Sequence, residues 1–148
     1  MTRGNRPSKV MRYIKSQHYS YRKLILLKDL HEFHEEDIKQ QVMNVLSKLN
    51  KEICDKFKYV IVKRELEAWF LADPDAIKAV LGHKIEVNDP ETIDEPSNYI
   101  DSELQRMCKK RYVKSQKVSS AIAQVINVNK ARVKSRSFNC FLEIVINN

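Results

Sequence analysis

Residues 58–75 read KYVIVKRELEAWFLADPD, and this stretch decides how the chain folds. It begins with a short apolar run, which is typical of a strand buried on both faces. An aromatic and apolar segment follows at once, flanked by Glu65, Glu67, Asp73 and Asp75. Charged residues are common on amphipathic helices, so the simplest interpretation is a half-buried helix after a strand. The alternative is that some of these carboxylates face a functional site.

A second apolar run lies upstream, and the segment between the two runs has a helical pattern. Residues 22–29 (RKLILLKD) predict a buried strand. Residues 35–57 place apolar side chains three and four apart, which predicts a single helix of about six turns. Strand, helix and strand over about forty residues form a βαβ unit, whose strands run parallel. We therefore expect an α/β fold built around a short parallel sheet.

The rest of the chain is expected to be largely helical. Pro74 suits the first turn of a helix that Gly82 ends, and Ser97 suits the N-cap of another helix. Residues 83–96 are rich in turn-forming residues and predict a loop with a short extended piece. Further helical patterns occupy residues 7–19, 65–73, 97–112, 117–128 and 135–146. The C-terminal part is therefore predicted to be α-rich.

Two strands make a thin parallel sheet, because such sheets are normally larger and covered on both faces. Three sources of further strands stay open. Residues 84–87 (KIEV) or 142–146 (LEIVI) supply one, or a second copy of the chain completes the sheet in a homodimer. The third possibility is that the chain lacks an N-terminal strand.

Composition narrows the class of protein. With 148 residues, 43% of them hydrophobic and 31% charged, the chain is expected to be a single soluble globular domain. Only two glycines occur, which argues against a glycine-rich phosphate loop or a dinucleotide-binding fingerprint. No apolar run approaches a membrane span and no apolar signal region begins the sequence, so we expect a cytoplasmic protein without a membrane partner.

The net charge of +8 is unevenly distributed. Residues 1–28 hold eight Lys/Arg and no acid, residues 29–103 hold nine Lys/Arg and eighteen Asp/Glu, and residues 104–148 hold ten Lys/Arg and one acid. The basic ends would attract a polyanion, and the acidic middle could handle a metal or a substrate proton. The alternative is that basic helices only keep the protein in solution.

The order of the elements indicates where a site would lie. Because the two predicted strands are parallel, Asp29 and His31 leave the first at the edge where Glu65 leaves the second. Open parallel sheets bind ligands outside this edge. A carboxylate directly after a buried strand suits a hard cation, so we expect Asp29, with His31, to bind a metal ion, Mg²⁺. The alternative is that either residue caps the next helix.

Glu65 and Glu67 are the candidate catalytic carboxylates. Glu65 stands at the exit of the second strand, where a partly buried carboxylate would need a partner. Residues two apart on a helix point about 200° apart, so the pair cannot face one site if the helix has already begun. The alternative is that they are helix N-terminal carboxylates stabilised by the helix dipole.

A basic set in the C-terminal part is the candidate nucleic-acid-binding surface. Such clusters hold backbone phosphates through charge and counterion release. Aromatic residues are not interleaved with this set in the way that stacks bases, so readout of sequence is not expected. A solvated face is the alternative. The candidates are Lys109, Lys110, Arg111, Lys114, Arg132, Lys134 and Arg136.

Four segments carry a family resemblance. Residues 62–77 (VKRELEAWFLADPDAI) contain the pattern E-x-E-A-W-F-L-A-D, and residues 24–33 (LILLKDLHEF) form an aspartate-bearing strand. Residues 89–100 (DPETIDEPSNYI) and 135–145 (SRSFNCFLEIV) add a proline-acidic loop and an S-x-S-F helix. Together they resemble a prokaryotic family of unknown function that is placed in the Toprim-like superfamily.

This resemblance implies a fold and an activity. The fold would be a small three-layer Toprim-like (Rossmannoid) domain spanning residues 1–148, without its usual N-terminal strand. In that superfamily a glutamate after the first strand acts as general acid or base, and a D-x-D after a later strand holds magnesium for phosphodiester chemistry. Asp29 matches the first aspartate, His31 stands in place of the second, and the early glutamate has no counterpart.

Two functions follow from the resemblance. One is a metal-dependent nuclease or phosphotransfer domain that acts on nucleic acid. The other is a non-catalytic remnant that binds nucleic acid or a partner protein, for example in a defence system.

Overall fold

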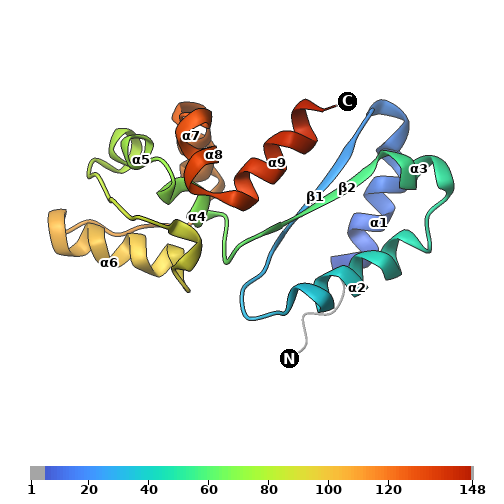
Figure 1. Ribbon diagram of the computed structural model, residues 1–148, viewed down its shortest axis with the longest axis horizontal. Coiled ribbons are helices and arrows are strands. Elements are labelled where there is room, and N and C mark those ends of the chain that lie inside the picture. Colours follow the sequence, from blue (N-terminus) through green and yellow to red (C-terminus); the bar gives the residue numbers. More distant parts are fainter. Residues whose placement is uncertain (1–5, 148) are drawn as a thin grey trace. The chain divides into compact units, whose positions relative to one another are not determined.

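A computed structural model describes residues 6–147 (Figure 1). The chain divides into two compact units. Unit 1 consists of Met1–Lys28 and Phe33–Ile61, and unit 2 of Asp29–Glu32 and Val62–Asn148. Among residues 6–147, no helix combines the length and the apolar composition that crossing a membrane would require.

Unit 1 contains the two strands, except for their last residues Asp29 and Val62, and the helices before and between them. Helix α1 (Arg6–Gln17) and the 3₁₀ turn η1 (His18–Ser20) precede β1 (Leu24–Asp29). Helices α2 (Glu35–Leu46) and α3 (Lys51–Lys56) lead to β2 (Phe57–Val62), which pairs with β1 in a two-stranded parallel sheet. The buried apolar side chains of unit 1 come from its helices and from β2. They are Ile14, Ile38, Val42, Ile53, Phe57 and Val60.

The single six-turn helix predicted between the strands is wrong. α2 ends at Leu46, and Asn50 starts α3 by accepting a hydrogen bond from the Ile53 N–H (2.9 Å). Asparagine side chains compete for backbone hydrogen bonds in this way, which favours caps over helix interiors. The apolar spacing continues across the break, so periodicity alone could not reveal it.

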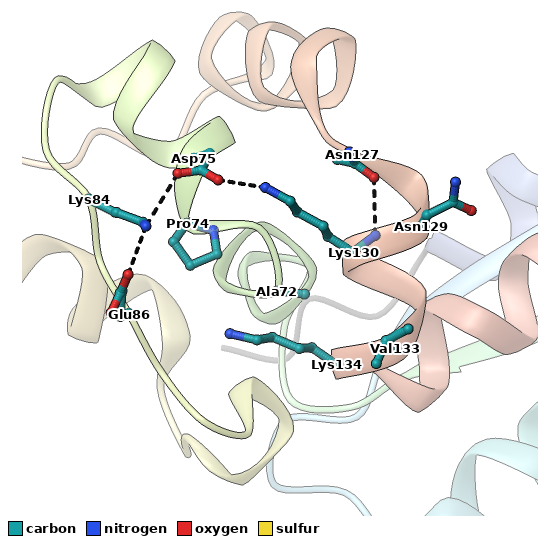
Figure 2. A pocket seen from close by; sticks show the side chains of 10 residues that line it. All are labelled: Ala72, Pro74, Asp75, Lys84, Glu86, Asn127, Asn129, Lys130, Val133 and Lys134. Carbon is teal, nitrogen blue, oxygen red and sulfur yellow. Dashed lines mark hydrogen bonds and ion pairs between the residues drawn. The ribbon is translucent and has the colours of Figure 1, made fainter.

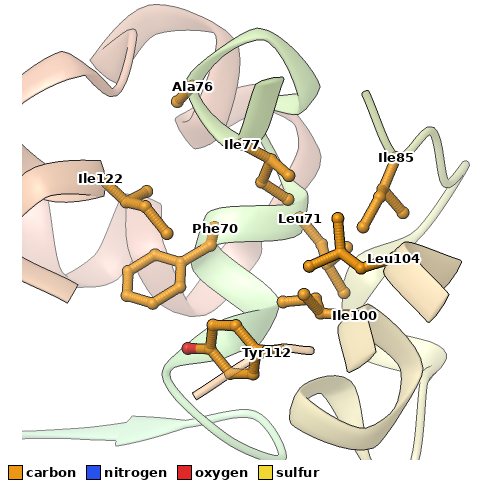
Figure 3. Packing of buried hydrophobic residues seen from close by; sticks show 9 residues of the cluster. All are labelled: Phe70, Leu71, Ala76, Ile77, Ile85, Ile100, Leu104, Tyr112 and Ile122. Carbon is orange, nitrogen blue, oxygen red and sulfur yellow. The ribbon is translucent and has the colours of Figure 1, made fainter. Parts of the chain in front are cut away.

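Unit 2 is helical. It contains α4 (Glu67–Leu71), α5 (Pro74–Leu81), the 3₁₀ turn η2 (Pro90–Thr92), α6 (Pro96–Cys108), α7 (Gln116–Val125), α8 (Val128–Lys134) and α9 (Arg136–Ile146). Figure 3 shows its core, in which Phe70 and Leu71 of α4 face side chains of α5, α6 and α7. As expected from the sequence, Trp69, Phe70 and Leu71 are buried.

The helix boundaries in unit 2 follow from caps. The Asp73 side chain accepts the Asp75 N–H at the start of α5, and Gly82 ends this helix with φ 86°, as expected. The predicted N-cap at Ser97 is wrong, because α6 begins at Pro96 after Glu95. Ser97 lies in the first turn, where its N–H has a partner outside the helix.

Two of the segments that carry the family resemblance meet at Trp69. The indole N–H donates to Ser137 Oγ (2.8 Å), and the ring packs against Phe138 and Phe141 at centroid distances of 5.1 and 5.2 Å. Glu91, from the proline-acidic loop, accepts three hydrogen bonds on Oε1: from Ser135 Oγ (2.7 Å), Ser137 Oγ (2.6 Å) and the Ser137 N–H (2.8 Å). These motif residues therefore fasten α4, the loop and α9 together.

The α/β class, the short parallel sheet and the helix-rich C-terminal part are confirmed; helix makes up 62% of the structure. The predicted third strand is wrong for both candidate segments, because residues 84–87 form a loop and residues 142–146 belong to α9. The apolar run at 142–146 continues a helical stripe instead of a strand. The Toprim-like three-layer arrangement stays a prediction.

Candidate functional site

The candidate site lies where the chain leaves the two parallel strands, within unit 2. Pairing continues beyond the strand ends, because the Leu30 N–H donates to the Val62 carbonyl (3.0 Å) and the His31 N–H to the Arg64 carbonyl (3.1 Å). His31 and Arg64 both have left-handed backbones, with φ of 45° and 65°. This conformation costs about 1–2 kcal/mol for a residue other than glycine. The pairing therefore holds both exits in a fixed, strained turn of the kind found at functional sites.

Five charged or titratable side chains meet there, and we call them the acidic edge: Asp29, His31, Glu65, Glu67 and Lys114. His31 lies between two carboxylates, with Nε2 3.6 Å from Asp29 Oδ2 and Nδ1 3.9 Å from Glu65 Oε1. Lys114 Nζ lies 3.0 Å from Glu67 Oε2 and 3.5 Å from Glu65 Oε1. The predicted convergence of Asp29, His31 and Glu65 is therefore present.

Glu67 is the buried member of the acidic edge, with 1% of its surface exposed. The Tyr112 hydroxyl donates to its Oε1 (3.0 Å), whereas Oε2 has no aligned hydrogen bond and only the ion pair with Lys114. Burial, reinforced by the negative charge of Glu67, raises the pKa of Tyr112. Tyr112 therefore stays a hydrogen-bond donor and holds the Glu67 carboxylate in place.

Glu65 reaches the same lysine because α4 begins only at Glu67. The rule that residues two apart diverge applies within a helix, and Glu65 precedes it. Its Oε2 accepts the Ser97 N–H (3.0 Å), an otherwise unpaired donor in the first turn of α6. Burial by itself would raise the pKa of Glu65, but the Ser97 N–H and Lys114 outweigh it and lower that pKa.

Asp29 differs from the two glutamates. Burial raises its pKa against the opposing influence of His31 and Lys114, and the negative charges of Glu67 and Glu65 raise it further. The pKa of Lys114 is also raised, because the carboxylates, Glu67 above all, outweigh the effect of burial. Lys114 is thus the permanent cation of the acidic edge, and the pKa values of Asp29 and Glu65 are shifted in opposite directions.

The donor set of the acidic edge does not fit Mg²⁺ as it stands. Magnesium requires several oxygen ligands in nearly octahedral geometry. Here Glu65 and Glu67 already bind Lys114, Ser97 and Tyr112, which leaves Asp29 and an imidazole. No group of three or more His, Cys, Asp or Glu within residues 6–147 is arranged to hold a metal ion.

The predicted basic set is dispersed among different partners. Lys114 belongs to the acidic edge, Arg111 pairs with Asp101 (3.1 Å), and Arg132 Nε donates to Asn139 Oδ1 (3.0 Å). Lys109, Lys110 and Arg136 are exposed. Several members are thus occupied within unit 2 and offer less charge to a ligand than the sequence suggests.

Lys134 lines a separate open hollow of about 610 Å³ (Figure 2). Asp75 binds two lysines there, Lys130 at 2.6 Å and Lys84 at 3.4 Å, and Lys84 also contacts Glu86 (2.8 Å). Lys134 itself donates to the Val87 carbonyl (3.1 Å). The hollow holds three lysines and two acids, so most of its charge is compensated.

Sequence reasoning missed Tyr112 and Ser97 as partners of the glutamates, and assigned Lys114 to phosphates instead of carboxylates. Lys114 lies 49 positions from Glu65, so no local pattern could connect them. Tyr112 is an aromatic residue within a basic stretch, and this was the available signal. Ser97 contributes its backbone N–H, which no residue type reveals.

A sequence model of one protein family, the domain of unknown function DUF4276, matches residues 6–146. The chain belongs to this family. A search of curated proteins found no match, and a search of solved structures found none either. The acidic edge lies wholly inside the part of the chain that matches DUF4276.

Proposed function

We propose that this DUF4276 protein binds nucleic acid through unit 1. The proposal rests on the unequal distribution of charge between the two units. Unit 1 holds 13 Lys/Arg and 5 Asp/Glu, a net of +8, whereas unit 2 holds 14 of each and is neutral. A basic surface of this kind attracts the phosphate backbone and gains affinity by releasing counterions. The exposed cations of unit 1 include Arg12, Arg22, Lys48, Lys51 and Lys58.

Binding should be tested by the fluorescence anisotropy of labelled DNA and RNA oligonucleotides over a range of salt concentrations. We expect an affinity that falls steeply as salt rises, because each phosphate contact adds about 0.9 to the logarithmic salt slope on duplex DNA and about 0.7 on single strands. An affinity that does not depend on salt, or no binding at low salt, would refute the proposal.

A second candidate function is phosphodiester hydrolysis at the acidic edge. It is favoured by the pairing of His31 with Asp29, the carboxyl group whose pKa is raised. His31 would take a proton from the attacking water. As the bond from phosphorus to the leaving oxygen breaks, Asp29 would give that oxygen a proton, which requires that Asp29 be in its protonated form when the step begins.

Gel assays of end-labelled DNA and RNA test this second function, run in parallel with Mg²⁺ and with EDTA. We expect cleavage by the unaltered protein and at least a hundredfold loss in Asp29→Asn, the range of one acid–base group. Cleavage that requires Mg²⁺ would favour the hypothesis of a metal-dependent, Toprim-like nuclease. No cleavage in either buffer would leave nucleic-acid binding without turnover. Equal cleavage by Asp29→Asn would show that Asp29 is not the general acid.

A further inference from the structure

Unit 1 displays a run of tyrosines among its cations. Residues 12–23 read RYIKSQHYSYRK and span the end of α1, η1 and the turn into β1. Three tyrosines in this run are exposed: Tyr13 by 59%, Tyr19 by 76% and Tyr21 by 45%. Large aromatic side chains usually bury much of their area, so three exposed rings in one short segment require an explanation.

The segment is built as a surface and is not a loose loop. Ile14 is buried (6% exposed) and anchors α1, so that Arg12 and Tyr13 are turned outward next to it. Tyr13 and Tyr21 are neighbours on this surface, because a side-chain hydrogen bond with Tyr21 raises the pKa of Tyr13. Arg12 and Arg22 are exposed beside them, and residues 1–28 contain no acid.

We infer that residues 12–23 form a binding surface for unpaired bases, with single-stranded nucleic acid as the ligand. Every base has a π-face that can stack on an aromatic ring, while neighbouring cations follow the phosphates. In a duplex the base faces are covered by their neighbours, so exposed tyrosines gain contacts only from single strands. This inference rests on the proposed nucleic-acid binding and adds its substrate class.

The test compares two triple variants by anisotropy on matched single-stranded and duplex oligonucleotides. Replacing Tyr13, Tyr19 and Tyr21 by Leu keeps the apolar character and the charge but removes the rings. Stacking contributes about 1–3 kcal/mol per base, so we expect at least a tenfold loss of single-strand affinity. Duplex affinity and the salt slope should change little, because the phosphate contacts remain.

The matched triple variant with Phe at the same positions keeps the rings and removes only the hydroxyls. We expect it to bind single strands within about threefold of the unaltered protein, since stacking needs the ring alone. Phe33→Leu, which removes an exposed ring outside the segment, serves as the control and should bind unchanged.

The outcomes separate this inference from the proposal on which it rests. Equal affinity for single strands and duplexes, with no loss in the Leu variant, overturns base stacking but leaves nucleic-acid binding intact. An absence of binding to either form overturns both. Circular dichroism shows whether the Leu variant is folded. If it is unfolded, the Phe variant still tests the inference: a Phe variant that binds duplexes more tightly than single strands would refute it. Separate DNA and RNA arms identify the kind of single strand.

Discussion

The two units of this protein differ in net charge and in how far their charged side chains are paired. Unit 1 carries the entire net charge of +8, together with its exposed tyrosines. Unit 2 is neutral, and its charged side chains are largely paired: Asp75 with two lysines, Arg111 with Asp101, and Lys114 with Glu65 and Glu67. Excess charge opposes compaction, whereas buried charge requires a partner.

The contrast agrees with the two proposed functions, which place the attraction of a polyanion in unit 1 and chemistry at the acidic edge of unit 2. Surplus positive charge draws a polyanion from a distance and depends little on where each cation lies. A site that handles protons needs fixed groups with altered pKa values, and therefore a compensated, well-packed environment. Unit 2 provides such an environment around Asp29, whose pKa is raised, and Glu65, whose pKa is lowered.

The largest expected effect concerns the packing of unit 2. Glu91→Ala should lower the free energy of unfolding of unit 2 by about 3 kcal/mol, because it leaves the buried Ser135 and Ser137 without their acceptor. Trp69 is the sole tryptophan and lies in unit 2, so its fluorescence during urea denaturation reports this unit alone. Glu95→Ala, at an exposed carboxylate that accepts a hydrogen bond from the Asn98 side chain (2.9 Å), is the control. Equal midpoints for the two variants would show that the Glu91 contacts do not hold unit 2 together.

The next prediction tests whether unit 2 depends on its internal cation. Lys114→Met leaves Glu67 buried without a counter-charge, which should cost about 2 kcal/mol of stability, less than for a fully buried pair because Lys114 is 52% exposed. Lys117→Met removes an exposed lysine nearby and should have no effect.

The same variant tests the magnesium prediction. If Lys114 takes the place of a metal at the acidic edge, Lys114→Met should gain saturable Mn²⁺ binding that the unaltered protein lacks, as measured by calorimetry. Saturable binding of equal strength in both proteins would show that Asp29 and His31 suffice for a metal, as the sequence predicts. If the variant unfolds and Mn²⁺ does not restore it, the idea that an ion can replace Lys114 is wrong.

Sequence patterns predicted the parts of this fold that local chemistry determines. Short apolar runs predicted both strands, but the prediction that β1 is buried on both faces is wrong, because none of its residues is fully buried and Leu27 is 40% exposed. Parallel pairing predicted that Asp29 and Glu65 lie at one edge, where both contact His31. The predictions that failed concern residues whose structure depends on competing hydrogen bonds or on contacts between distant parts of the sequence. Asn50 breaks a helix that periodicity continues, and residues 142–146 are apolar enough for a strand yet complete α9. Lys114 reaches Glu65 across 49 positions, a contact that only packing determines.

A third prediction compares the units directly as binding surfaces. Neutralising three exposed cations of unit 1 (Arg12→Ala, Arg22→Ala and Lys58→Ala) should weaken oligonucleotide binding roughly tenfold and reduce the salt slope by up to about 3. Neutralising Lys109, Lys110 and Arg136 of unit 2 removes the same charge and should weaken binding less than about threefold. The reverse ranking would return the binding surface to the C-terminal basic set predicted from the sequence.

The smallest effect is a dependence on pH at Glu65. Its pKa is lower in the folded protein than in the unfolded chain, so its ionised form stabilises the fold. This contribution is complete above the unfolded value of about 4.3 and is lost as the pH falls through the lower, folded value. Glu65→Gln should therefore be less stable than the unaltered protein by about 1 kcal/mol at neutral pH, and the difference should disappear in acid. Urea denaturation followed by Trp69 fluorescence at several pH values measures it. A difference that persists unchanged into acid would mean that Glu65 acts through its shape and neutral hydrogen bonds, and that the compensation of charge in unit 2 does not extend to this edge.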